Sequence, residues 1–311
     1  MLVDLLLTDK RFYTFEGYAS RHVGHALNER GISCRMVDLS GGMLHAYFSS
    51  LQETSPSWTL SFANLTPHRK PLCDVVSIPH FYWVEGSPAS ALHFVHSSHG
   101  RLGLSDAALC QRLSSAHVLF LPPGIEKMPS STKNFEVVLF ADVIELPLLE
   151  KTWHENFESS AIEALRQAVS GRDPLLAGIQ FADAEQYLNA QKTLNALSAL
   201  QGVKIDVFGE HAGRDWLVRL PQSVYLHSQL PYTEHFEVLK RSAIAIAEPS
   251  SPWYWRAIAA GCLPLPPDKE QISHYLARPQ ERAFEIERLG QALPQMTWEK
   301  QVEKLIQVMP C

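Results

Sequence analysis

Short apolar runs alternate with helical stretches from the start of the chain. The first three segments are a strand over Val3–Thr8, a helix over Tyr18–Asn28 and a strand over Ile32–Leu39. Four later apolar runs are also expected to be strands: Trp58–Ala63, Val75–Trp83, Leu92–His96 and His117–Leu121. Continuous apolar strands separated by helices or turns are typical of a parallel sheet covered on both faces. The pattern therefore predicts a doubly wound α/β domain.

The same pattern begins again after a polar segment. Pro122–Lys133 concentrates proline, serine, glycine and charge, as an interdomain linker does. Beyond it we expect strands at Phe135–Val143, Val203–Gly209, Val224–Leu226 and Ala243–Ala247, and helices at Trp153–Val169, Ala184–Leu200 and Glu234–Arg241. Trp298–Val308 is amphipathic and is expected to be a terminal helix of this second half. The sequence predicts two Rossmann-like domains, residues 1–128 and 134–311.

Composition agrees with two packed domains and narrows the partners. The chain has 311 residues, 46% of them hydrophobic and 19% charged, which is enough apolar surface for two cores. Its formal net charge is -6 and its Lys and Arg residues are scattered, which argues against nucleic acid as a ligand. Asp4 interrupts the apolar amino terminus, and no later run is long enough to span a membrane. We expect a cytoplasmic protein whose membrane contact is at most peripheral.

No metal or cofactor site is expected from the sequence. The five cysteines are far apart and lack paired metal-ligand spacing, and no Asp-x-Asp motif lies at the end of a predicted strand. No Gly-x-Gly-x-x-Gly follows the first strand, so a nicotinamide cofactor is not expected either.

The segment Tyr232–Leu265, YTEHFEVLKRSAIAIAEPSSPWYWRAIAAGCLPL, carries a resemblance to a known family. Its order of helix, buried strand, Pro-Ser turn, helix and small-residue strand resembles the donor-binding core of retaining GT-B glycosyltransferases, including the spore-protein-like branch. Val207–Gly209 and Leu119–Glu126 (LFLPPGIE) resemble two further pieces of that fold. The resemblance implies two Rossmann-like domains facing across a cleft. It also implies metal-independent transfer of a sugar, with retention, from a nucleotide sugar held by the second domain to the hydroxyl of an unidentified acceptor held by the first.

The residues of this segment place a ligand site on physical grounds as well. Glu248 follows the predicted strand Ala243–Ala247, and open α/β sheets bind ligands at the carboxyl ends of their strands. A helix begins just after it, and its first N–H groups, with Ser250 and Ser251, are candidate donors to a diphosphate. Helix capping is an equally good interpretation of the two serines.

Further donor-site candidates come from the family pattern. The resemblance aligns Glu248 with the first glutamate of a Glu-x7-Glu motif, which contacts the donor sugar, but Arg256 stands where the second should accept hydrogen bonds from the ribose. Arg256 is expected to pair with the diphosphate, to pair with Glu248, to form a surface salt bridge, or to mark a donor site that is rearranged or lost. Other substrate-binding candidates are Gly17, Gly209, Arg214, Tyr232 and Lys240.

The first domain supplies candidate acids and bases. His80, Glu85, His96 and His99 lie at or just beyond the ends of two predicted strands, and Glu85 falls roughly where many relatives carry a histidine. Glu248, Glu85, His80 and His99 are therefore the catalytic candidates. For His80, Glu85, His96 and His99 the alternative to catalysis, and the better supported interpretation, is an ordinary hydrogen-bonded histidine or solvated carboxylate. The alternatives to a glycosyltransferase are a nucleotide-sugar epimerase or hydrolase of the same fold, and a degenerate homologue that binds a nucleotide or protein without turnover.

Overall fold

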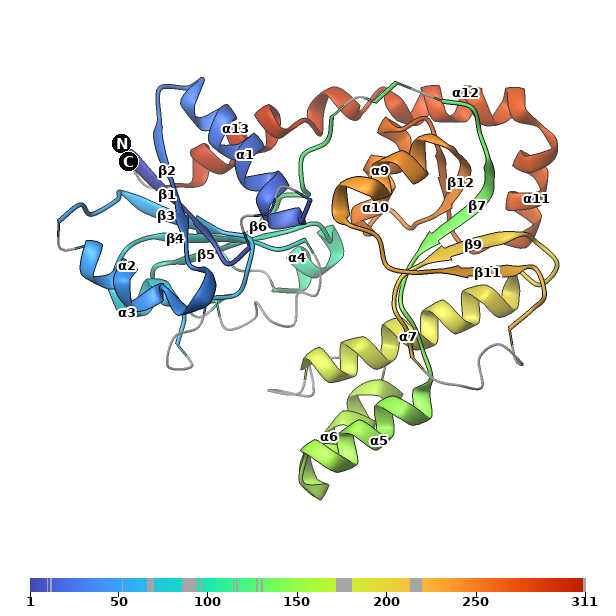
Figure 1. Cartoon of the computed structure of the whole chain (residues 1–311), viewed down its shortest axis with the longest axis horizontal. Helices are drawn as coiled ribbons and strands as arrows, with labels where there is room; N and C mark the ends of the chain where they lie inside the picture. Colours follow the sequence, from blue (N-terminus) through green and yellow to red (C-terminus); the bar gives the residue numbers. More distant parts are fainter. Residues whose placement is uncertain are drawn as a thin grey trace.

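The computed structural model describes most of the chain, and the residues outside the description are 10, 12, 52, 66–69, 86–93, 96, 114, 116, 127, 130, 172–180, 213–219 and 310–311. Two parallel sheets organise the described residues, one in each half of the chain (Figure 1). Among the described helices, none has the length and apolar character needed to span a membrane.

The first sheet has six parallel strands in the order β2-β1-β3-β4-β5-β6. Its strands are β1 (Leu2–Leu7), β2 (Ser33–Asp38), β3 (Trp58–Ser61), β4 (His80–Trp83), β5 (Gly100–Leu104) and β6 (Val118–Phe120). Its helices are α1 (Phe15–Asn28), α2 (Leu44–Ser50), α3 (Leu72–Val76) and α4 (Ala107–Leu113), with the 3-10 turn η1 (Ser40–Gly42). In β1, Val3 and Leu5 enter one hydrophobic cluster and Leu6 enters another. Burial on both faces explains the unbroken apolar run of this strand.

The second sheet has five parallel strands in the order β11-β9-β7-β12-β13, and β8 and β10 form a separate parallel pair. The strands are β7 (Phe135–Phe140), β8 (Val143–Ile144), β9 (Ile205–Phe208), β10 (His211–Ala212), β11 (Val224–His227), β12 (Ser242–Ile246) and β13 (Leu263–Leu265). The helices are α5 (Leu146–Asn156), α6 (Ser159–Ser170), α7 (Phe181–Ala199), α9 (Tyr232–Lys240), α10 (Pro252–Ala259), α11 (Lys269–Ala277), α12 (Pro279–Gly290) and α13 (Trp298–Val308), with η6 (Leu293–Gln295). These two sheets confirm the expected Rossmann-like α/β fold class.

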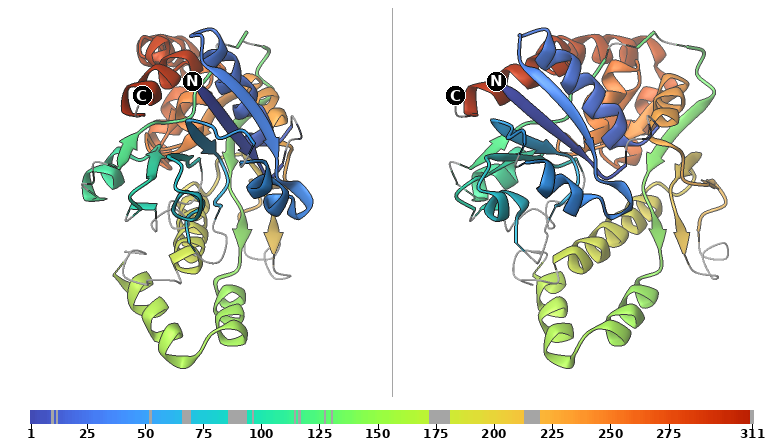
Figure 2. Two further views of the ribbon diagram at one scale, coloured as in Figure 1. Left: turned by 90° about the vertical axis from the view of Figure 1, so that its left-hand side faces the viewer. Right: turned by 60° about the vertical axis from the view of Figure 1, so that its left-hand side comes forward.

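Among the described residues, three helices stand between β8 and β9. The single helix expected over Trp153–Val169 is two helices, α5 and α6, separated at Phe157 and Glu158. They project from the second sheet and pack against α7 around a small cluster that contains Trp153 and Leu165 (Figures 1 and 2). This packing fixes α7 beside the sheet.

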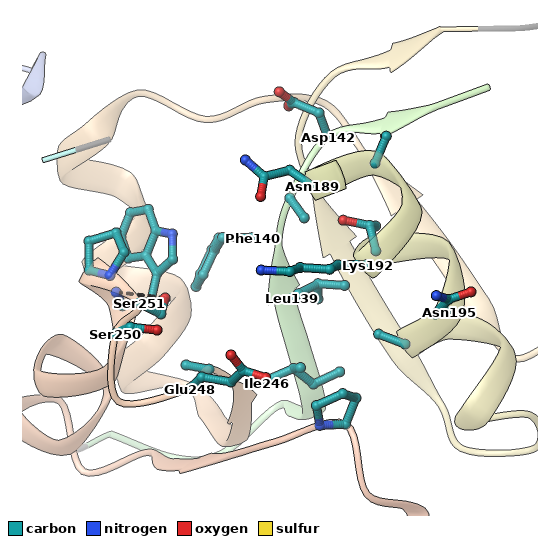
Figure 3. A pocket seen from close by; sticks show the side chains of 18 of the residues that line it. Leu139, Phe140, Asp142, Asn189, Lys192, Asn195, Ile246, Glu248, Ser250 and Ser251 are labelled. Carbon is teal, nitrogen blue, oxygen red and sulfur yellow. Dashed lines mark hydrogen bonds between the residues drawn. The ribbon is translucent and has the colours of Figure 1, made fainter. Parts of the chain in front are cut away.

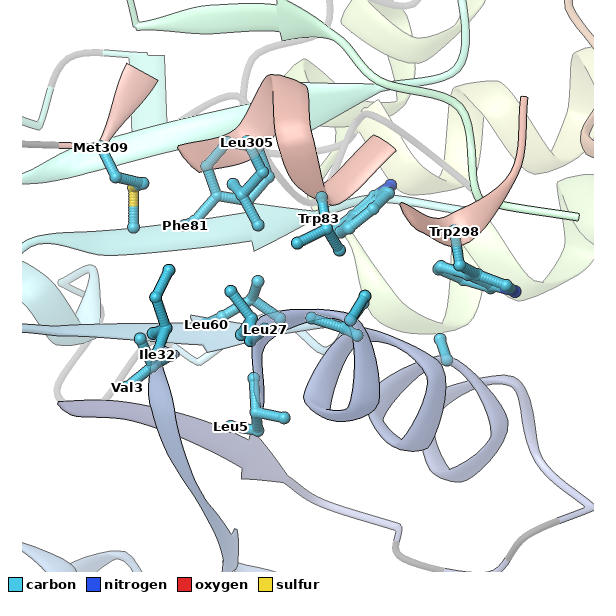
Figure 4. Packing of buried hydrophobic residues seen from close by; sticks show 14 of the residues in the cluster. Val3, Leu5, Leu27, Ile32, Leu60, Phe81, Trp83, Trp298, Leu305 and Met309 are labelled. Atoms are coloured by element: carbon cyan, nitrogen blue, oxygen red, sulfur yellow. The ribbon is translucent and has the colours of Figure 1, made fainter. Parts of the chain in front are cut away.

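The terminal helix α13 packs with the first half and not, as expected from the sequence, with the second. Its apolar stripe, Trp298, Val302 and Leu305, is fully buried against α1 and the first sheet (Figure 4). Gly124 permits this crossing, because a Cβ there would lie 2.4 Å from the Trp298 ring. The Ile125 amide also donates to the Met296 carbonyl at 2.9 Å, so the two segments that join the halves lie side by side.

Two strand predictions in the first half differ from the structure where the residues are described. Val75 and Val76 end helix α3, so β4 begins only at His80. Of the expected strand Leu92–His96, Phe94 and Val95 are not in a strand, and the other three residues lie outside the description. Gly100–Leu104, which was not predicted, forms β5. The glycines of β5 concealed it, yet Gly103 is needed there because a Cβ would lie 2.8 Å from the Phe81 ring.

Candidate functional site

A cavity of about 880 Å³ opens at the carboxyl edge of the second sheet (Figure 3). The strand order makes β7 and β12 neighbours at the point where the connections turn to opposite sides, and open α/β sheets bind their ligands in the crevice there. Most of the described lining residues come from the end of β7, from α7 and from the turn between β12 and α10, and Ile144 of β8 and Pro267 after β13 also line the cavity. All of them belong to the second half of the chain.

The turn between β12 and α10 forms one wall. Glu248 is exposed to the cavity beyond the end of β12, so its expected position at the carboxyl edge is confirmed. Ser250 and Ser251 also line the cavity, and Ser251 is the N-cap of α10 because its hydroxyl accepts from the Trp253 amide at 3.2 Å.

The start of α10 offers fewer hydrogen-bond donors than the sequence predicts. Pro252 has no N–H, the Trp253 amide is held by the Ser251 hydroxyl, and the Tyr254 amide donates to the Ser251 carbonyl at 3.1 Å. An anion at this wall would therefore depend on Ser250 and on side chains from elsewhere.

Helix α7 forms the opposite wall. The sequence pattern predicts this helix but not its place in the site. Polar side chains recur along its cavity face at helical spacing: Gln186, Asn189, Lys192, Thr193 and Asn195. Lys192 extends from α7 into the space between α7 and α10 (Figure 3). Among the described lining residues it is the one basic side chain, and it shares the cavity with the carboxylates of Asp142, Glu185 and Glu248.

Aromatic rings complete the cavity. Phe140, at the end of β7, and Trp253, at the start of α10, both line it, with ring centroids 4.7 Å apart. His235 of α9 contacts both rings, with its centroid 4.8 Å from that of Phe140 and 4.8 Å from that of Trp253. Apolar ring surface beside hydrogen-bonding amides and carboxylates suits a ligand with both apolar faces and hydroxyl groups.

Gly209 supports the cavity instead of lining it. A Cβ at this position would lie 2.2 Å from the Ala141 carbonyl oxygen, so only glycine allows the loop after β9 to pack on the loop after β7. The next amide, of Glu210, donates to the Asp142 carboxylate at 2.8 Å. Ala141 and Asp142 are lining residues, so this contact holds part of the wall.

Arg256 points away from the cavity and into the contact between the two halves. Its guanidinium lies 2.5 Å from the Glu85 carboxylate, and the Arg256 side chain is only 2% exposed. The expected pairing with Glu248 and the expected surface salt bridge are therefore both wrong. The contact is a close charge pair that lacks well-aligned hydrogen bonds.

Glu85 and Tyr232 are both enclosed by this contact. Glu85 follows β4 at the carboxyl edge, as expected, but it faces Arg256 and does not line the cavity. Burial raises the pKa of Glu85, and the Arg256 charge opposes that rise. Burial also raises the pKa of the Tyr232 hydroxyl well above its usual value. Tyr232 therefore remains a neutral residue of the interface.

His80 and His99 lie at the wrong edge of the first sheet for catalysis. His80 begins β4, His99 precedes β5, and the His80 amide donates to the His99 carbonyl at 3.0 Å. His80 is fully buried between the hydroxyls of Thr59, at 2.7 Å, and Ser61, at 3.0 Å. Burial lowers the pKa of His80 to about 3, so the ring is neutral and has a packing role.

The remaining candidates lie elsewhere. Gly17 is in the first turn of α1, where its amide donates to the Thr14 hydroxyl at 3.2 Å, and not in a free turn. Lys240 ends α9 and pairs with Glu237 at 2.6 Å, away from the described lining. Arg214 and His96 lie outside the described residues. Within the described part of the chain, no three His, Cys, Asp or Glu side chains are grouped to hold a metal ion.

Comparison with known proteins supports the fold. No protein-family model and no curated protein sequence matches the chain. Among solved structures, WaaG, a glycosyltransferase involved in lipopolysaccharide biosynthesis, is similar over 99% of both chains at 11% identity, with a TM-score of 0.50. T4 phage β-glucosyltransferase is similar over 98% of this chain and 95% of its own, at 8% identity and a TM-score of 0.46. The chain has the glycosyltransferase fold of GT-B type, with two Rossmann-like domains.

Proposed function

We propose that the protein is a glycosyltransferase that binds a nucleotide-sugar donor in the cavity between α7 and α10 and transfers the sugar to an acceptor hydroxyl. The observation that carries the proposal is the position of Glu248, at the carboxyl end of β12 and inside a cavity at the switch point of a GT-B fold. The resemblance of Tyr232–Leu265 to the donor-binding core of retaining enzymes supports a retaining, metal-independent reaction.

The lining residues suggest a division of roles. Glu248 would accept hydrogen bonds from sugar hydroxyls. The side-chain amides of Gln186, Asn189 and Asn195 on α7 would both accept hydrogen bonds from these hydroxyls and donate to them. Lys192 would offset part of the diphosphate charge, with the Ser250 hydroxyl as a further donor. The ring faces of Phe140 and Trp253 would pack against the flat or apolar part of the donor. In a retaining reaction the donor phosphate would receive the proton of the acceptor hydroxyl.

Thermal unfolding with UDP-, GDP-, ADP- and CMP-sugars tests the proposal, because a ligand that binds only the folded state raises the midpoint. At a hundred times its Kd, the ligand adds about 2.7 kcal/mol to the free energy of unfolding. We expect one of these donors to raise the midpoint of the wild type and the Glu248→Ala variant to lose turnover while it keeps its fold. Glu237→Ala is the matched control, since Glu237 is exposed and pairs with Lys240.

Product analysis separates the competing functions. Transfer to an added acceptor supports the glycosyltransferase, and a changed or hydrolysed sugar without an acceptor supports an epimerase or hydrolase. Binding without any turnover supports a non-catalytic homologue. Unchanged turnover in Glu248→Ala would remove Glu248 from the active site.

A further inference from the structure

We propose that Arg256 is a positioning residue through which Glu85 of the first half sets the shape of the cavity in the second half. The interdomain clamp is the group Phe15, Glu85, Tyr232, Trp253 and Arg256. In this arrangement, the clamp makes ligand affinity depend on contact between the two halves. The ligand part of this inference rests on the proposed function, whereas the contact between the halves does not.

The ion pair joins parts of the chain that are distant in sequence. Glu85 lies two residues beyond the end of β4 in the first half, and Arg256 lies in α10 of the second half. The side chains are 17% and 2% exposed, and their charged atoms are 2.5 Å apart. The attraction between two opposite charges weakens as the distance between them grows. Separation of the halves would therefore leave the Glu85 and Arg256 charges without a partner.

Aromatic rings from both halves surround the guanidinium. Arg256 lies 5.7 Å from the ring centroid of Phe15, 5.0 Å from that of Tyr232 and 5.1 Å from that of Trp253. Phe15 begins α1 of the first half and also contacts the Tyr232 ring at 5.3 Å. In addition, the Tyr232 amide donates to the Tyr13 carbonyl at 2.8 Å. The clamp therefore connects the two halves through an ion pair and aromatic contacts, beside a backbone hydrogen bond.

Trp253 connects the clamp to the cavity. It stands one helical turn before Arg256 on α10, contacts the guanidinium, and lines the cavity beside Phe140. The Trp253 amide is bound to the Ser251 hydroxyl in the same wall. A shift of Arg256 would thus move Trp253 and the start of α10, although neither Arg256 nor Glu85 is a lining residue.

The first test needs no ligand. Protein labelled with 5-fluorotryptophan is compared by fluorine NMR in the wild type and in Glu85→Gln, with the Trp253 resonance assigned from Trp253→Phe. We expect Glu85→Gln, which keeps the size of the side chain, to shift or broaden the Trp253 resonance and to raise the radius of gyration in small-angle X-ray scattering. Arg288→Met is the matched control, because Arg288 pairs with Glu285 at the same 2.5 Å but is 57% exposed.

The second test measures affinity for UDP, GDP and ADP by calorimetry. We expect the nucleotide that binds the wild type to bind Glu85→Gln at least tenfold more weakly, and to bind Arg288→Met unchanged. Arg256→Met should weaken binding similarly; if that variant does not fold, Glu85→Gln decides the question.

The outcomes separate the two proposals. An unchanged Trp253 resonance and radius of gyration in Glu85→Gln would overturn the clamp, and equal affinity in Glu85→Gln would overturn its link to the cavity. If no nucleotide binds the wild type, the ligand part of the inference is overturned together with the proposed function, while the NMR and scattering results still decide the clamp.

Discussion

Each of the two sheets has a switch point at its carboxyl edge, but the residues at the two switch points make different contacts. At the second sheet, the switch point between β7 and β12 opens into a cavity with polar walls. At the first sheet, the switch point lies between β1 and β3. The described residues that follow these two strands contact other residues of the first half. The Glu16 carboxylate accepts from the Thr8 and Asp9 amides, both at 2.8 Å, and Phe62 packs against Phe15 at 5.5 Å.

This difference teaches that one edge holds the two halves together, while the other lines the proposed ligand cavity. Glu85, at the first edge, is committed to Arg256 and the contact between the halves, while Glu248, at the second edge, is exposed to a cavity. Substitutions at the first edge should therefore lower the free energy of unfolding even when no ligand is present. Changes on the cavity walls should reduce ligand binding and leave stability nearly unchanged.

The largest expected effect is the loss of one member of the buried ion pair. Arg256→Met should lower the free energy of unfolding by about 3–5 kcal/mol, because the Glu85 carboxylate is left buried without its partner. Adding Glu85→Leu should recover part of the loss, since the unpaired charge is removed. Urea unfolding of the two single variants and the double variant measures these changes. If Arg256→Met lowered the free energy of unfolding by less than about 1 kcal/mol, the ion pair would not stabilise the first edge.

A smaller effect comes from His80 at the amino edge of the first sheet. Its pKa is lowered from 6.5 to about 3 by burial, so between these values the unfolded chain binds a proton that the folded chain does not. Stability from this residue is complete above pH 6.5 and is lost as the pH falls, by about 2 kcal/mol at pH 5.

Unfolding free energies of the wild type and His80→Gln at pH 8 and pH 5 isolate this contribution. The difference between the two proteins should shrink by about 2 kcal/mol on acidification. A constant difference would mean that His80 titrates normally and that this part of the first sheet is open to water.

The smallest expected effect on stability is at the cavity wall. Lys192→Met should change the free energy of unfolding by less than about 0.5 kcal/mol, because the Lys192 side chain is exposed in the cavity. It should nevertheless weaken binding of the nucleotide sugar by about tenfold, which is about 1.4 kcal/mol. Lys151→Met is the control, since Lys151 lies on the exposed face of α5 and pairs with Glu155. Calorimetric affinity equal to the wild type would exclude Lys192 from the ligand site.

Local patterns in the sequence predicted most of the fold and one wall of the site. The apolar runs identify β1, β7 and β12, and the Pro-Ser turn after β12 correctly places Glu248, Ser250 and Ser251 at a strand end. These features depend on residues close together in the chain. The short strand β5 escaped because its glycines serve a packing contact that is visible only in three dimensions.

The remainder depended on contacts between distant residues. An amphipathic pattern shows that α13 needs an apolar partner, but not that the first sheet provides it. The polar positions of α7 have the same spacing as an ordinary solvated face, so Lys192 gave no local signal of a cavity. Arg256 departs from the family pattern in the sequence, yet its partner Glu85 lies in the other half of the chain.

Hydrogen exchange with and without the nucleotide sugar that raises the unfolding midpoint tests the central claim most directly. If the cavity at the second sheet is the ligand site, amide protection should increase in residues 139–144, 182–199 and 247–253, which supply its walls. Glu248→Ala should abolish that protection. Protection confined to the first sheet, or no protection by any of the nucleotide sugars, would contradict the account.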